Sequence, residues 1–297
     1  MIVCFLDVAI YSLVARMQNK PLTLTLVIAV YNEERHIKAC LESVARQSEM
    51  PDEVLVIDNN CTDKTIAIAK QFAFVKVISE PKQGLIAARN RGFNAAKTDL
   101  VARVDADAVL NPDWVVEAKR SLRSSDMAAV TGLAYTYLFR GIQTKSRFWS
   151  WVYFMTREAD FNIRILWGAN MVMRRSAWAA IKESVCLDDT AVHEDQDMSF
   201  LLAARGLRVG RNNRLLITTP GDEYNEFRKF YEYMVRAAKT KRRHRENVKK
   251  ASERGLTLLP IQRVAMLAVV LVPVLLFTIF SVIHLVVTGG RTSNRYA

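Results

Sequence analysis

The chain has 297 residues, of which 51 % are hydrophobic and 24 % are charged, and this composition excludes an intrinsically disordered polypeptide. Its length predicts one large folded domain with an appendage. The formal net charge is +12, and the four scattered cysteines contain no CxxC pair, so neither structural zinc nor a disulfide framework is expected.

The first twenty residues form an apolar N-terminal extension. Ile2–Val14 is apolar but carries Asp7, and no basic region precedes it. The segment is therefore short for a membrane span and unlike a signal peptide. We expect residues 1–20 to lie at a membrane interface or to pack as an extension of the domain.

From residue 21 to about 220, short apolar runs alternate with helical patterns, which predicts an α/β domain with a mostly parallel sheet flanked by helices. The predicted strands are Leu24–Ala29, Val54–Ile57, Val75–Ile78, Leu100–Val104 and Met127–Tyr137. The predicted helices are Glu34–Arg46, Lys64–Phe72, Leu85–Ala96 and Pro112–Leu122. In such a sheet, ligands bind beyond the carboxyl ends of the strands.

Polar side chains follow three of these strands at that position. Tyr31 and Glu33 follow the first strand, Asp58 follows the second, and Asp105 and Asp107 follow the fourth. No Gly-x-Gly-x-x-Gly opens the first helix, and no Gly-x-x-x-x-Gly-Lys occurs in the chain. A dinucleotide-binding fold and a P-loop NTPase are therefore disfavoured.

Carboxylates are the strongest candidates for chemistry. Asp105 and Asp107, on a tight turn, can share one hard divalent cation with water and phosphate oxygens, although a solvated turn or a helix cap has the same pattern. Glu194 and Asp195 open a later helical pattern and are either helix caps or include a general base. Arg89 can bind a diphosphate bidentately, or it is a surface arginine.

The carboxyl-terminal part combines a basic run with the longest apolar segment. The segment from Arg228 to Arg254 contains eleven Lys or Arg residues and three Glu residues, and it therefore carries +8 of the net charge. Val264–Val287 has no charged side chain and would form about 36 Å of helix, enough to span a bilayer. The basic flank places the preceding residues in the cytoplasm. We expect a basic amphipathic juxtamembrane segment (221–258), which lies among headgroups or packs on the domain, a transmembrane helix (259–288) and a tail (289–297).

Six segments, in this order, resemble the catalytic domain of the family 2 glycosyltransferases, inverting enzymes of the GT-A fold. They are VIAVYNEE at 27–34, VIDNNCTD at 56–63, GLIAARNRG at 84–92, VDADAVLNPDW at 104–114, GANMVMRRSAW at 168–178 and HEDQDMS at 193–199. The resemblance covers residues 24 to about 205 and implies a nucleotide-diphospho-sugar transferase fold for residues 21–220. A Gln-x-x-Arg-Trp motif typical of processive synthases does not follow the Glu-Asp pair, which argues against a polymerase.

The resemblance also implies a role for each matching residue. Residues expected at the donor nucleotide are Tyr31, Glu33, Asp58, Arg89 and Asp105. Mg²⁺ or Mn²⁺ would be held by Asp105 and Asp107, and Asp195 would be the catalytic base. The expected contacts to the sugar or acceptor are Gly168, Ala169, Asn170 and Glu194.

These expectations combine into an inverting, metal-dependent glycosyltransferase. It would move a single sugar from a nucleotide sugar, most favourably a UDP-sugar, to a lipid-linked or cell-envelope glycan acceptor. The protein would be a single-pass protein of the cytoplasmic (inner) membrane, with its catalytic domain in the cytoplasm and no nucleic-acid partner. The alternatives are a polyprenyl-phosphate glycosyltransferase and a non-catalytic membrane-bound scaffold for glycan assembly. A sugar nucleotidyltransferase is less favoured because its Gly-rich loop is missing after the first strand.

Overall fold

The computed structural model describes residues 21–123, 125–139, 142–219 and 227–268. The expected N-terminal extension (1–20), most of the expected transmembrane helix (259–288) and the tail (289–297) lie outside these residues. Within the described part of the chain, no helix is both long and apolar enough to cross a bilayer. The transmembrane helix therefore stays a prediction from the sequence.

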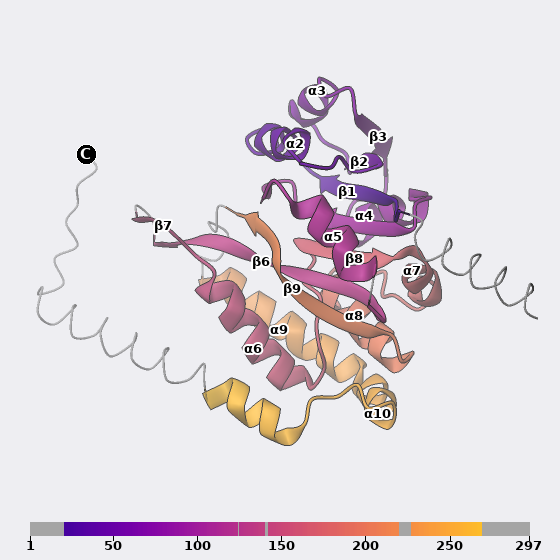
Figure 1. Cartoon of the computed structure of the whole chain (residues 1–297), viewed down its shortest axis with the longest axis vertical. Coiled ribbons are helices and arrows are strands. Elements are labelled where there is room, and N and C mark those ends of the chain that lie inside the picture. Colours follow the sequence, from indigo (N-terminus) through magenta and orange to yellow (C-terminus); the bar gives the residue numbers. More distant parts are fainter. Residues whose placement is uncertain (1–20, 124, 140–141, 220–226, 269–297) are drawn as a thin grey trace, which may run out of the picture.

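Four parallel strands form one half of the sheet, in the spatial order β3–β2–β1–β4 (Figure 1). They are β1 (Leu24–Val30), β2 (Glu53–Asp58), β3 (Val75–Ser79) and β4 (Leu100–Val104). The helices that follow the first three are α2 (Ile37–Ala45), α3 (Thr65–Ala69) and α4 (Leu85–Ala95). The strands are apolar because the sheet is covered on both faces: Leu26 and Ile28 of β1 join one core and Val27 joins the other.

The other half of the sheet is mixed, which corrects the expectation of a mostly parallel sheet. Here β8 (Asn170–Arg174) runs antiparallel to β4, and β6 (Met127–Phe139) runs antiparallel to β8. Next to β6, β9 (Arg208–Thr218) is parallel. The short strands β5 (Val109–Leu110) and β7 (Ile142–Ser146) pair antiparallel with β9 and β6. An apolar run predicts a buried strand but not its direction, so the sequence pattern could not reveal this change.

Helices enclose a separate core on each face of the sheet. On one face, α2 contributes Leu41, and α5 (Trp114–Arg123) contributes Trp114. On the other face lie α4, α7 (Arg175–Ile181) and α8 (Glu194–Ala204), where Phe93 of α4 meets Trp178 of α7 edge-to-face at 5.2 Å. This second core fixes the position of α8, which begins at the candidate base.

A further layer of helices packs against α8 (Figure 1). Its members are α6 (Phe148–Phe161), α9 (Phe227–Arg243) and α10 (Arg245–Glu253). The His193 N–H donates to Thr240 Oγ1 of α9 (3.0 Å), and His244 Nε2 lies 2.7 Å from Asp197 Oδ1, with both side chains of the latter pair buried. The described part of the basic segment 221–258 therefore packs on the domain through one helical face.

The outer face of this segment is exposed and basic. Lys239, Arg242 and Arg243 of α9 are exposed, as are Lys249 and Lys250 of α10. Residues 260–268 then form a helix that exposes the apolar side chains of Ile261 and Val264. A basic face thus leads directly into an exposed apolar one.

Asn170, at the start of β8, ties three elements together inside the core. Its Oδ1 accepts a hydrogen bond from Trp114 Nε1 (2.9 Å), and its Nδ2 donates to the carbonyl oxygens of Leu133 (3.0 Å) and Leu215 (2.9 Å). A Cβ at Gly132 would lie 1.9 Å from the Leu215 oxygen and 2.3 Å from Asn170 Nδ2, so only glycine fits beside this amide. Asn170 is therefore fixed as a link between strands.

Replacing Asn170 with alanine should lower the free energy of unfolding by about 3 kcal/mol, because three hydrogen bonds are lost and three buried polar groups stay unpaired. Urea unfolding of the purified chain measures this change. Asn213→Ala, at an exposed position of β9, is the matched control and should change stability by less than about 0.5 kcal/mol. Equal effects of the two substitutions would contradict this assignment.

Candidate active site

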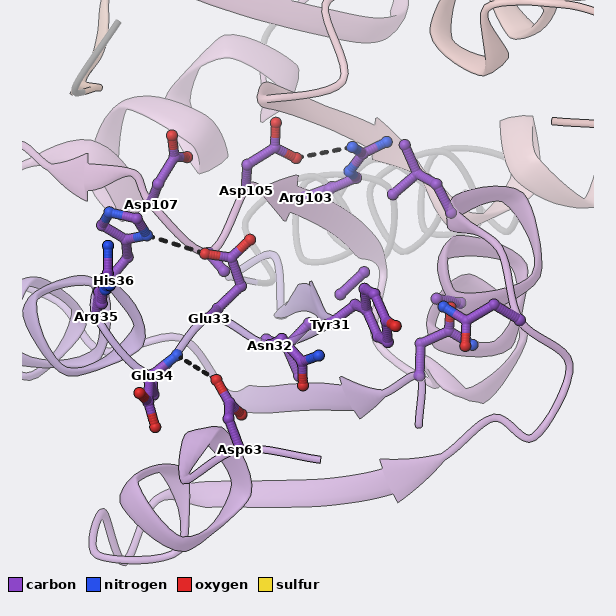
Figure 2. Close-up of a pocket in the computed structure, with 17 residues that line it drawn as sticks. Tyr31, Asn32, Glu33, Glu34, Arg35, His36, Asp63, Arg103, Asp105 and Asp107 are labelled. Carbon is purple, nitrogen blue, oxygen red and sulfur yellow. Dashed lines mark hydrogen bonds and ion pairs between the residues drawn. The ribbon is translucent and has the colours of Figure 1, made fainter. Parts of the chain in front are cut away.

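A cavity of about 700 Å³ opens at the carboxyl ends of β1, β2 and β4 (Figure 2). This is the edge of the sheet at which the sequence predicts a binding crevice. Most of its wall comes from the loop after β1 and the loop after β4. The polar lining residues are Tyr31, Asn32, Glu33, Glu34, Arg35, His36, Asn59, Asp63, Gln83, Arg103, Asp105 and Asp107.

The loops after β1 and β2 are interlocked by hydrogen bonds. The Glu33 N–H donates to Thr65 Oγ1 (2.7 Å), and the Glu34 N–H donates to Asp63 Oδ2 (3.0 Å; Figure 2). His36 Nδ1 lies 3.0 Å from Glu33 Oε2, which orients this carboxylate at the cavity. Tyr31 is 53 % exposed, so its ring is available for stacking on a planar ligand.

Asp58 stands beside the cavity, although a direct contact with the nucleotide is expected from the resemblance. Its Oδ1 accepts the N–H of Cys61 (2.9 Å). The next residue, Asn59, which lies just beyond the end of β2, lines the cavity instead. Asn59 Oδ1 accepts the N–H of Gly84 (2.8 Å), where φ is 135°, a backbone conformation that favours glycine.

Asp105 and Asp107 both line the cavity, on the loop that leaves β4. The described residues contain no group of three or more His, Cys, Asp or Glu side chains able to hold a metal ion. Two carboxylates fit a hard cation that takes its remaining ligands from water and from the oxygens of a bound phosphate. The donor set therefore suits Mg²⁺ or Mn²⁺ bound together with a diphosphate.

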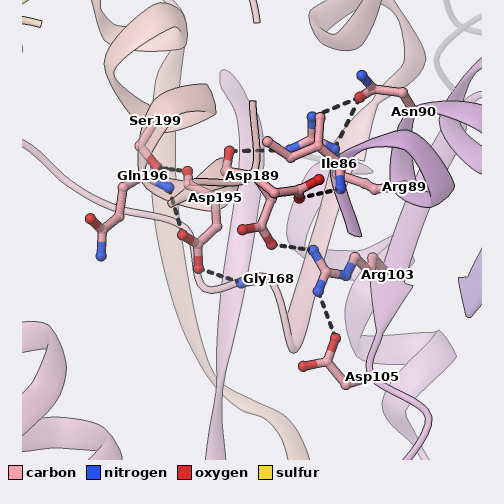
Figure 3. A network of polar contacts seen from close by, with 11 residues as sticks. Ile86, Arg89, Asn90, Arg103, Asp105, Gly168, Asp189, Asp195, Gln196 and Ser199 are labelled. Carbon is pink, nitrogen blue, oxygen red and sulfur yellow. Dashed lines mark hydrogen bonds and ion pairs between the residues drawn. The ribbon is translucent and has the colours of Figure 1, made fainter. Parts of the chain in front are cut away.

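Arg103 joins this cavity to α8, a role that our reading of the sequence missed (Figure 3). Its side chain is only 3 % exposed, Nη2 donates to Asp105 Oδ1 (2.7 Å), and Nη1 donates to Glu194 Oε1 (2.6 Å). The signal was present in the sequence, because Arg103 is the single charge within the apolar strand Leu100–Val104. A buried arginine needs acidic partners for its charge.

Glu194 and Asp195, adjacent at the start of α8, have opposite environments. Burial would raise the pKa of Glu194, but the charges of Arg103 and Arg89 lower it to about 2. For Asp195, burial and the Glu194 charge raise the pKa to about 7. The Asp195 carboxylate also accepts the N–H groups of Gly168 (2.9 Å) and Gln196 (2.7 Å). A carboxyl group with a pKa near neutrality is suited to act as a general base.

Arg89 does not lie where a diphosphate contact requires it. Its side chain is fully buried, and it is not among the residues that line the cavity. Its Nη1 donates to the Glu194 carbonyl oxygen (3.2 Å), and its Nε and Nη2 donate to Asn90 Oδ1. Because its hydrogen bonds go to the start of α8, Arg89 supports Glu194 here instead of facing a donor.

The expected sugar or acceptor contacts divide into two groups. Gly168 and Glu194 lie against Asp195 and Arg103, at the site. Ala169 packs in the hydrophobic core, and Asn170 is committed to the hydrogen bonds that join strands. In the structure Ala169 and Asn170 are both buried, and their contact with a sugar or acceptor stays a prediction from the resemblance.

The loop before α8 is also fastened to the donor side of the site. The Asp189 Oδ1 accepts the N–H of Ile86 in the first turn of α4 (2.9 Å; Figure 3). A Cβ at Gly84 would lie 2.2 Å from Asp189 Oδ2, so the close approach of this loop requires glycine. The start of α4 and the approach to α8 are therefore held together.

Sequence comparison identifies relatives that share this region. The family model described as Glycosyl transferase family 2 matches residues 25–181. EpsH of Bacillus subtilis is 35 % identical over 101 residues, which cover 33 % of this chain and 29 % of EpsH. Glycosyltransferase AglE of Haloferax volcanii is 31 % identical over 121 residues, which cover 38 % of this chain and 40 % of AglE. The match thus spans less than half the length of these two curated relatives.

Solved structures share the fold over more of the chain. The mannosyltransferase PcManGT from Pyrobaculum calidifontis, in complex with GDP-Man and Mn²⁺, has a TM-score of 0.61 at 19 % identity and covers 93 % of this chain and 84 % of that chain. S. aureus TarS 1-349 in complex with UDP-GlcNAc has a TM-score of 0.55 at 18 % identity and covers 73 % of this chain and 66 % of that chain. The likeness shows an α/β nucleotide-sugar transferase fold with a mixed sheet.

The family match begins in β1 and includes both loops that form the wall of the cavity. It ends in α7, before Glu194 and Asp195. It covers more than half of the 297 residues. The chain therefore belongs to Glycosyl transferase family 2.

Proposed function

We propose that this glycosyltransferase moves one sugar from a nucleotide-diphosphate sugar to an acceptor hydroxyl, with inversion at the anomeric carbon and with Asp195 as the general base. The observation that carries the proposal is the bridge through Arg103. Through this bridge, Asp105 of the cavity is linked to Glu194, the residue next to Asp195. This link supports a reaction in which the cavity holds the donor and Asp195, whose pKa is raised to about 7, accepts a proton.

The donor would bind in the cavity with its base near Tyr31 and its diphosphate toward Asp105 and Asp107. The structures of PcManGT with GDP-Man and Mn²⁺ and of TarS with UDP-GlcNAc support a nucleotide sugar as the ligand of this fold. We propose a UDP-sugar as the donor and Mg²⁺ or Mn²⁺ as the cation held by Asp105 and Asp107. The cation would supply positive charge that stabilises the departing diphosphate.

In the proposed reaction, Asp195 accepts the proton of the acceptor hydroxyl, and the hydroxyl oxygen forms a bond to the anomeric carbon. The bond from that carbon to the phosphate oxygen breaks, and its electron pair leaves with the nucleoside diphosphate. The N–H groups of Gly168 and Gln196 orient the Asp195 carboxylate. A single displacement of this kind inverts the configuration of the anomeric carbon.

We further propose that the acceptor is lipid-linked or a cell-envelope glycan, at the cytoplasmic face of the inner membrane. The exposed bases of α9 and α10 favour anionic headgroups, and the exposed Ile261 and Val264 lead into the uncharged sequence that ends at Val287. The catalytic domain would then lie in the cytoplasm, attached by a single span.

Asp195→Asn should lower the rate of transfer by about 10²- to 10⁴-fold and leave donor binding unchanged, because the amide cannot accept the proton. The measurement is the release of nucleoside diphosphate from the nucleotide sugar with membranes of the source organism as acceptor. Asp126→Asn, at an exposed residue paired with Arg208, is the matched control and should keep full activity. Full activity of Asp195→Asn would exclude base catalysis by this residue and would favour an acceptor that needs no base, such as a polyprenyl phosphate.

One nucleoside diphosphate should stabilise the protein against heat, and this effect should depend on Mn²⁺. At a hundredfold excess over the dissociation constant, binding adds about 2.7 kcal/mol of stability, which thermal unfolding detects. The diphosphates UDP, GDP and dTDP and the monophosphate CMP are compared with and without Mn²⁺. Asp107→Ala should abolish the Mn²⁺-dependent part of the shift, and a shift that this variant retains would show that Asp107 holds no cation.

Activity should rise with pH through about pH 7, because Asp195 must lose its proton to act as a base and its pKa is raised to about 7. Glu194→Gln removes the negative charge that helps to raise this pKa. The pKa of Asp195 then falls, so the acid limb of the pH profile of kcat/KM should move to lower pH. An acid limb that stays in place would show that another group controls it.

A further inference from the structure

Arg103 is a buried cation whose hydrogen bonds are incomplete. Its two Nη atoms donate to Asp105 and Glu194. Its Nε–H is buried and has no hydrogen-bond partner among the residues that the structure describes. Buried donors without partners are rare because they are costly. Four described residues have such an unpaired buried atom, and of these four Arg103 is the one that lines the cavity, where a ligand can supply the acceptor.

The same side chain belongs to the wall of the donor cavity. Arg103 lines the cavity with Asp105 and Asp107, on the β4 side, whereas Tyr31 lies at the end of β1 (Figure 2). Its Nη1 donates to Glu194, the neighbour of the proposed base. Arg103 thus stands between the carboxylates expected to hold the cation and the carboxylate expected to accept the proton. The bond that breaks must lie in this interval.

We infer that Arg103 is a catalytic residue that binds the β-phosphate of the donor through its Nε–H, an inference that rests on the proposed function. A guanidinium suits this position because phosphate oxygens accept charge-assisted hydrogen bonds. When the bond between the anomeric carbon and the phosphate oxygen breaks, the electron pair moves onto that phosphate. A cation placed there stabilises the growing charge. Arg103 therefore takes the role that the resemblance implies for Arg89.

The shape of the site keeps the Arg103 guanidinium in place. A Cβ at Gly168 would lie 2.8 Å from Arg103 Nη1 and 3.0 Å from Glu194 Oε1. An alanine at position 168 would therefore displace the ion pair without removing either charge. Gly168→Ala provides a second variant that acts on the same contact by a different route.

The experiment compares a nucleoside diphosphate with its monophosphate by titration calorimetry on the full-length, detergent-purified chain with Mn²⁺. The diphosphate is the one of UDP, GDP and dTDP that the wild type binds most tightly, and it is compared with the monophosphate of the same nucleoside. Arg103→Lys keeps a positive charge but removes the Nε–H, so the dissociation constant of the diphosphate should rise about tenfold or more, the effect of one charge-assisted hydrogen bond. The dissociation constant of the monophosphate should stay within about twofold, which also shows that the variant is folded. Gly168→Ala should show the same selective loss.

Arg211→Lys is the matched control. Arg211 is another arginine of the sheet with a buried, unpaired Nε, and its Nη2 donates to Glu158 Oε2 (2.7 Å), but it does not line the cavity. This variant should bind both nucleotides like the wild type. The contact would be overturned if Arg103→Lys bound the diphosphate with an unchanged dissociation constant. It would also be overturned if Arg103→Lys and Gly168→Ala lost monophosphate and diphosphate binding to the same extent. Absence of binding of every nucleotide to the wild type would instead overturn the proposed function, and the inference with it.

Discussion

The double ion pair of Arg103 is the interaction on which the candidate site depends. A buried cation inside the sheet is tolerated only if its charge is paired with negative charges. The partners of Arg103 are Asp105, just after β4, and Glu194, at the start of α8 and 91 residues further along the chain. The pairing sets the distance between the donor cavity and the helix that carries Asp195. It also requires a residue without a side chain at position 168, where any Cβ would press on the guanidinium.

The same ion pairs give the adjacent carboxyl groups of Glu194 and Asp195 different pKa values. Glu194 points to Arg103 and stays ionised, so its charge acts on Asp195. Within the described part of the chain, the Asp195 carboxylate accepts hydrogen bonds from the N–H groups of Gly168 and Gln196. Burial and that neighbouring charge both oppose ionisation of Asp195. The arrangement produces one permanent anion and one group that can exchange a proton near neutral pH. Arg103 and Arg89 create this difference because their charges lower the pKa of Glu194.

Local patterns in the sequence predicted the strands and helices of the parallel half correctly, because a buried parallel strand is a short apolar run and the helices between strands are amphipathic. They also located Asp105, Asp107 and Glu33 at one cavity, since these residues follow strands that meet at one edge. The direction of the strands in the mixed half of the sheet was not predictable from local patterns. The burial of Asn170 and Arg89 was not predictable either, because it depends on hydrogen-bond partners far along the chain. Arg103 was predictable in principle, as a charge inside an apolar strand.

The contacts between α8 and α9 have a consequence for where the folded unit ends. Thr240 and His244 bind His193 and Asp197, on either side of the candidate base, and the backbone of Thr257 forms a bridge with Ile163. A boundary at residue 220 would therefore remove internal partners of α8 and expose the aromatic ring of Phe200, on which His244 stacks. The basic helices are part of the enzyme's interior as well as its surface. A shortened chain intended for crystallisation has to extend beyond residue 258 to keep α8 packed.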